Sequence, residues 1–420
     1  MPEGRTQPYF LGHSLFLVSI TAYLFLQSWK PDIERAVFWG EMFSLLLFFY
    51  SLRFNCQHPL QKKIVLGVSI WIFLFPLYAA AISYFLYLDD LEFSYFLRHL
   101  AFFYYALFFF AGYKLGPEMI QRLSRYWIPI LAGVILTTCF VGGGLGSAMA
   151  LGFVWLVCQK GRPDKRVFYL YWAGMSFLFL MVSHHGTSKA LLILLVCSAP
   201  VIYLLKLWNK TNVAMLNKAS LRFFLLIVTV LLVVGANHLI DMMYAVAAAG
   251  GSFHAFFEDF GFTDMNGVWR IMLWTYLFDR FLDHPLGIGL GTPLIGRELA
   301  NFMYLVQKPG DEFTSGAHNS FLTFLVRLGV PFLIYFLCMS SFAGQLILRF
   351  LRRTGYRVLD TVEKRFVFST LLTFLIAVIQ ACFNVVLESP LTAGLFWFYF
   401  GLFVRVTGDF LAAPRENASC

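Results

Sequence analysis

Arg270 and the glycine-rich turn after it are candidates for binding an anionic group. Arg270 lies in an apolar run, and Gly287, Gly289 and Gly291 follow soon after Pro285. A guanidinium offers a planar pair of donors to a phosphate, and glycines let backbone N–H groups approach it. The glycine spacing does not fit a dinucleotide fingerprint. The alternative is an amphipathic helix whose arginine reaches the membrane surface, followed by an ordinary turn.

His318 is a candidate general base. It precedes an apolar run, where Asn319 or Ser320 is a natural N-cap. The positive end of a helix dipole lowers the pKa of an imidazole, which keeps it neutral as a base must be. A lone histidine at a helix start is more often structural than catalytic. The residues around His318 are therefore needed to distinguish these two roles.

Two further cations, Lys189 and Arg98, lie at the ends of other apolar runs. Either could bind a phosphate, but a lysine in this position can also simply extend to the membrane surface. Asp89 and Asp90 resemble an acidic metal motif. We favour a solvated loop, since few carboxylates are grouped there, and we expect no metal site.

The elements that must position these residues are membrane spans. The chain has 420 residues, of which 59% are hydrophobic and 13% charged. Soluble domains have about 25% charged residues, so a soluble enzyme with one core is excluded. Apolar runs of about 20 residues, the length that crosses a bilayer, recur along the chain. We predict an all-α polytopic membrane protein with 12 spans, at residues 9–27, 36–52, 64–86, 99–113, 126–140, 146–158, 167–183, 188–205, 222–239, 319–348, 366–387 and 391–406.

Basic residues are distributed unevenly about these spans. With the N-terminus inside, the inner segments hold 23 of the 32 basic residues, and the outer segments hold 16 of the 23 acidic residues. Positive charge is retained on the cytoplasmic side, so both chain ends are predicted to lie inside. The net charge of +9 is therefore a topology signal, and we expect no nucleic-acid partner.

One long outer loop divides the chain into three predicted parts. Residues 1–239 carry the first nine spans, residues 240–318 form the loop, and residues 319–420 carry the last three spans and a cytoplasmic tail. Loops of this length are usually functional. Within it, the pattern of apolar residues predicts a helix over residues 269–283, with Arg270 and Phe281 on one stripe.

Four motifs, in their order along the chain, resemble those of the O-antigen ligase and polymerase superfamily. They are the turn Thr187-Ser188-Lys189-Ala190-Leu191, the Trp269-Arg270 helix, the turn from Pro285 to Gly291, and His318-Asn319 with Leu322. The topology of 12 spans with one long loop before the last three is also similar to this superfamily. The family pattern usually has arginine where Lys189 stands, and lysine keeps the charge but loses the bidentate fork.

The resemblance implies an O-antigen ligase, a GT-C-like, metal-independent, inverting glycosyltransferase of the bacterial inner membrane that needs no cofactor. The donor would be undecaprenyl-diphosphate-linked O-antigen, and the acceptor the lipid A-core oligosaccharide on the periplasmic side, with membrane lipids around both. The implied roles are catalytic for His318 and Arg270, diphosphate-binding for Lys189, Arg98 and Arg270, and supporting for Asn319, Trp269 and Glu388.

The sequence is also compatible with other functions. An O-antigen polymerase would transfer between two lipid-diphosphate glycans, and a ligase that glycosylates protein would differ in its acceptor. A transporter or flippase for a lipid-linked sugar would need polar or broken helices near mid-membrane. The unusual charges of this chain instead lie at the outer face, which favours a transferase.

Overall fold

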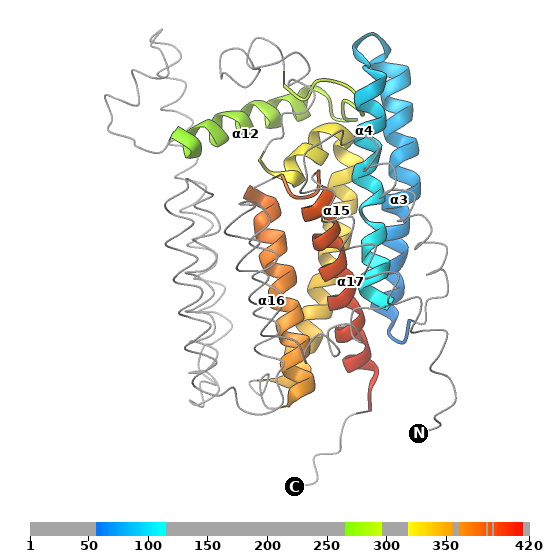
Figure 1. Cartoon of the computed structure of the whole chain (residues 1–420), viewed down its shortest axis with the longest axis vertical. Coiled ribbons are helices and arrows are strands. Elements are labelled where there is room, and N and C mark those ends of the chain that lie inside the picture. Colours follow the sequence, from blue (N-terminus) through cyan, green and yellow to red (C-terminus); the bar gives the residue numbers. More distant parts are fainter. Residues whose placement is uncertain are drawn as a thin grey trace, which may run out of the picture.

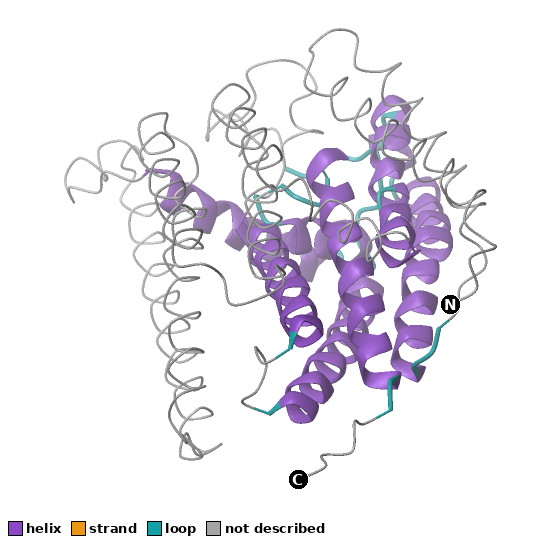
Figure 2. Cartoon of the chain, turned by 60° about the horizontal axis from the view of Figure 1, so that its bottom comes forward, coloured by secondary structure: helices purple, strands orange, loops and turns teal. Residues whose placement is uncertain are grey.

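The computed structural model describes residues 56–114, 265–295, 318–355, 361–383, 385–388 and 390–414. This part of the chain is all helix, turn and loop, without a strand, which confirms the all-α prediction (Figure 2). Five of the 12 predicted spans fall within it. The other seven, at residues 9–27, 36–52, 126–140, 146–158, 167–183, 188–205 and 222–239, lie outside the described residues.

The structure describes a helix at each of those five predicted spans, in the predicted order, and two further helical segments outside them. They are α3 (Pro59–Leu86), the 3-10 helix η1 (Leu88–Asp90), α4 (Phe93–Tyr104), α12 (Met265–Asp283), α15 (Ser320–Thr354), α16 (Val362–Phe383) and α17 (Pro390–Ala412). Within the described residues, four stretches are long and apolar enough to cross a membrane, namely Pro59–Leu86, Phe93–Lys114, Ser320–Thr354 and Thr392–Ala412, and Phe366–Cys382 is a shorter apolar helix.

The predicted ends of α3 and α16 are wrong by several residues. Helix α3 begins at Pro59 rather than Ile64, because His58 and Gln61 form a reciprocal capping box that adds a polar first turn. Hydropathy alone does not detect such a turn. Helix α16 ends at Phe383 instead of continuing to residue 387, since the chain turns there toward α17.

Among the described helices, α3, α4, α15, α16 and α17 pack into a bundle, and α12 lies across one end of it (Figure 1). Helix α15 is central, since it packs against α3, α12, α16 and α17. The turn between α3 and α4 and the start of α15 lie at the same end as α12, whereas the ends of α15 and α17 lie at the opposite end (Figure 1). That opposite end carries Arg349, Arg352 and Arg353.

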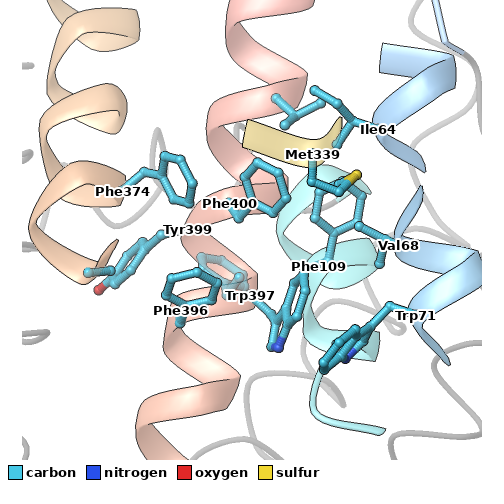
Figure 3. Close-up of a cluster of buried hydrophobic side chains, with 14 of the residues drawn as sticks. Ile64, Val68, Trp71, Phe109, Met339, Phe374, Phe396, Trp397, Tyr399 and Phe400 are labelled. Carbon is cyan, nitrogen blue, oxygen red and sulfur yellow. The ribbon is translucent and has the colours of Figure 1, made fainter. Parts of the chain in front are cut away.

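Aromatic side chains from several helices interlock in the core (Figure 3). The ring of Trp71 on α3 lies 5.0 Å from those of Phe103 on α4 and Phe324 on α15, and 6.2 Å from that of Trp397 on α17. Association of helices in lipid depends on close packing, because the hydrophobic effect gives little drive between helices there. This aromatic core therefore fixes how α15 is placed among its neighbours.

Helix α15 is broken near its start, which the sequence interpretation as a plain span missed. Gly329 has a φ of 65°, and Pro331 has no N–H to donate to Arg327 O. The segment that follows α12 bonds the groups left over at the break. Ile288 N donates to Val326 O (3.1 Å), Gly289 N donates to Arg327 O (2.9 Å), and Val330 N donates to Pro285 O (2.8 Å).

We predict that Gly329→Ala destabilises the protein by about 1–2 kcal/mol or more. A positive φ is strained for alanine, and its Cβ would meet the Pro285 carbonyl. Gly344→Ala on the same helix is the control, since no described atom lies within 4 Å of a Cβ added there. That control should be neutral or slightly stabilising. Thermal unfolding of both variants in detergent measures the difference, and equal melting temperatures would contradict the role of the break.

Candidate active site

Helix α12 places Arg270 at the end of the bundle. Its course over Met265–Asp283 confirms the predicted helix, which ends just before Pro285. The stripe of Leu273, Leu277 and Phe281 is buried against the loop residues after α12 and against Val326 on α15. Arg270, on the preceding turns, is partly exposed, and its buried Nε has no hydrogen-bond partner among the described residues.

The glycine segment, residues 285–292, is fixed to three helices by its own backbone. Leu290 N donates to Ser83 Oγ on α3 (2.7 Å), and Gly291 N donates to His99 Nδ1 on α4 (3.0 Å). Gly289 has a φ of 75°, and an added Cβ there would meet Ser83. These N–H groups are already bonded within the protein, so they are not available to bind an anion. The glycines instead allow close packing between helices.

His318 lies immediately before the N-terminus of α15, with the unusual φ of 48° for a residue other than glycine. Asn319 is the N-cap, as predicted, and its Oδ1 accepts a hydrogen bond from Leu322 N (3.1 Å). Burial lowers the pKa of His318, and the charge of Arg270 lowers it further. The direction of this shift agrees with the prediction, although its causes here are burial and Arg270 rather than the helix dipole.

Glu388 lies in the turn between α16 and α17 and is bonded to the first turn of α15. Ser320 Oγ donates to Glu388 Oε2, and Ser320 Oγ also accepts hydrogen bonds from Val386 N (2.9 Å) and Leu387 N (3.0 Å). Burial raises the pKa of the carboxyl group, although the hydrogen bond from Ser320 and the charge of Arg327 act in the opposite direction. Glu388 is thus hydrogen-bonded to Ser320, which lies two residues after His318.

Arg327 is a polar residue of this region that the sequence interpretation did not single out. Only 2% of it is exposed, and its Nη1 donates to Gly289 O (3.2 Å) and Thr292 O (3.4 Å). Its position inside an apolar run was the available signal, because ionisable residues within membrane spans are rarely there without a partner or a role.

The remaining predicted site residues are not brought to this cluster by the described structure. Arg98 is exposed on α4, and Asp89 and Asp90 are exposed in η1. Lys189 lies outside the described residues, and Trp269 lies on α12 but its side chain is not described. Among the described residues, no group of three or more His, Cys, Asp or Glu side chains could hold a metal ion.

The described part of the chain thus defines an α-helical membrane protein with a buried polar cluster at one end of its bundle. Residues 170–337 match the family model described as O-Antigen ligase, which confirms the resemblance found in the sequence. The matched region contains Lys189, Arg270, His318 and Arg327. No curated protein matches the chain. The family match supports a glycosyltransferase function of the O-antigen ligase or polymerase type in a bacterial membrane.

We predict that Ser320→Ala destabilises the protein by about 2 kcal/mol or more, because two buried backbone N–H groups lose their acceptor and Glu388 loses a donor. Ser69→Ala on α3 is a matched control, since its hydroxyl donates within its own helix to Val65 O (3.0 Å). Thermal unfolding in detergent compares the two. A loss no larger than that of the control would show that the turn between α16 and α17 does not depend on Ser320.

Proposed function

We propose that this protein joins O-antigen polysaccharide from undecaprenyl diphosphate to the lipid A-core oligosaccharide at the periplasmic face of the inner membrane. The observation that carries the proposal is that half-buried His318 directly precedes α15 at the end of the bundle where α12 carries Arg270, whose charge lowers the pKa of the imidazole. Both residues lie within the region that matches the O-Antigen ligase family. A neutral imidazole can act as base, and a cation can stabilise the leaving diphosphate, which are two functions that transfer from a lipid diphosphate uses.

In the proposed reaction, neutral His318 accepts the proton of the acceptor hydroxyl. The hydroxyl oxygen then bonds to the anomeric carbon on the face opposite the diphosphate. The bond from that carbon to the diphosphate oxygen breaks, and the electron pair leaves with the lipid diphosphate, so the configuration inverts. A positioned base contributes about 10² to 10⁴ in rate.

Arg270 stabilises the negative charge that develops on the leaving diphosphate. The loss of one such donor typically costs ~3 kcal/mol in the transition state. Lys189 and Arg98 are proposed helpers, Asn319 and Trp269 support the two catalytic residues, and the reaction uses neither a metal nor another cofactor. The diphosphate is already an activated leaving group, so the chemistry requires no nucleotide.

The predicted organisation completes this proposal. Residues 1–239 and 319–420 form the membrane part, in which apolar helices provide a surface for the polyprenyl and acyl chains, and residues 240–318 form the periplasmic loop. The break in α15 does not favour a transporter. Its backbone groups are bonded by the glycine segment, whereas the unwound backbone of transporter helices is left to coordinate the transported ion or substrate.

We expect the purified protein, given undecaprenyl-diphosphate glycan and lipid A-core, to form the joined glycolipid in the presence of EDTA. His318→Ala and Arg270→Ala should each lower the rate of product formation by about 10²-fold or more while retaining the melting temperature of the parent. Product analysis by gel and mass spectrometry also distinguishes a polymerase, which would lengthen the lipid-linked glycan in place of transferring it. A requirement for magnesium or manganese would contradict the metal-independent mechanism and implicate Asp89 and Asp90.

The pH dependence gives a second prediction. Since the pKa of His318 lies below its ordinary value of 6.5, the base remains neutral, and ligation should persist, somewhat below pH 6.5. Arg270→Gln removes one cause of the shift, so the acid limb of the pH profile of kcat/KM, which reports groups of the free enzyme, should move to higher pH. Arg270→Lys keeps the charge but loses the fork, and should reduce the rate without moving that limb. Identical limbs in all three proteins would exclude His318 as the titrating base.

A further inference from the structure

The polar groups at the start of α15 connect three segments that are distant in sequence. Gly289 and Arg327 bond each other reciprocally, since Gly289 N donates to Arg327 O (2.9 Å) and Arg327 Nη1 donates to Gly289 O (3.2 Å). The guanidinium also donates to Thr292 O (3.4 Å). Arg327 therefore joins the glycine segment, which directly follows the helix of Arg270, to the helix that His318 precedes.

The charge of Arg327 also acts toward the turn between α16 and α17. The guanidinium is almost completely buried, and its charge lowers the pKa of the Glu388 carboxyl group. A buried charge without compensation is strongly unfavourable, so the loss of either side chain should affect the other.

Glu388 transmits this dependence to the residues beside His318. Its carboxylate accepts a hydrogen bond from Ser320, which belongs to the first turn of α15. Ser320 follows the N-cap Asn319, and His318 comes directly before that cap. Hydrogen bonds thus join Arg327 to the glycine segment and Glu388 to the start of α15.

We propose that Arg327 and Glu388 are positioning residues that hold His318 in register with Arg270. This inference rests on the proposed function, since positioning matters only if those two residues act on one substrate. Neither Arg327 nor Glu388 needs to touch the donor or the acceptor. A displacement of about 1 Å at a reacting group can cost on the order of 10²-fold in rate.

Steady-state ligation kinetics test this role. Arg327→Met and Glu388→Gln should each lower kcat by about ten- to a hundredfold, with KM for the lipid-linked donor little changed and the acid limb of the pH profile unmoved. The double variant Arg327→Met/Glu388→Met leaves no buried charge unpaired. Its melting temperature should return toward that of the wild type, whereas its kcat should stay as low as that of the single variants. Recovery of kcat together with stability would reduce the pair to a structural role.

Arg353→Met is the matched control, because Arg353 is another arginine of α15 that bonds backbone carbonyls, at the opposite end of the bundle. It donates to Leu411 O (2.6 Å) and Ala413 O (2.7 Å). Its loss should lower stability with little effect on kcat per folded protein. A loss of kcat equal to that of Arg327→Met would contradict a specific positioning role.

Hydrogen–deuterium exchange tests the connection without any ligation. Arg327→Met should increase exchange both at the amides of Ile288 and Gly289 and at those of Val386 and Leu387, whereas Arg353→Met should change neither pair. Exchange altered at only one pair would overturn the inference. If the wild type showed no ligation, the proposed function would fail while this measurement still decided whether Arg327 connects the two segments.

Discussion

The break in helix α15 is the constraint on which the rest of the described structure depends. Pro331 cannot donate to Arg327 O, and Gly329 turns the backbone out of the helical path. Groups freed in this way are very costly in an apolar environment unless something bonds them. The glycine segment after α12 does so with three hydrogen bonds between backbones. Because those bonds fix the segment, they also fix where α12 ends, and hence where Arg270 lies.

The aromatic core and the polar cluster hold α15 in two different ways. Trp71 and its neighbouring rings fix the helix laterally against α3, α4 and α17, but such packing is not directional enough to orient a side chain at the helix end. Hydrogen bonds supply that direction. Ser320 uses its hydroxyl as donor and acceptor at once, so the first turn of α15 and the turn that carries Glu388 are fixed together.

Periodicity and hydropathy predicted the helices, whereas contacts between distant segments were beyond them. The five described spans, the α12 helix and the N-cap at Asn319 follow from local patterns, and these were found. The roles of the glycines and of Arg327 depend on partners between 35 and about 200 residues away, which no local pattern encodes. Pro331 was nevertheless a visible sign that α15 could not be a regular helix throughout.

Arg270 affects His318 in a way that depends on what else is bound. With no anion near, its charge lowers the pKa of the imidazole and so weakens it as a base. Under the proposed mechanism, a diphosphate bound at Arg270 cancels much of that charge, and the pKa of His318 rises again. Proton transfer from the acceptor hydroxyl then becomes more favourable once the donor is in place. The same pair would thereby link the order of binding to the strength of the base, which a cation remote from the histidine could not do.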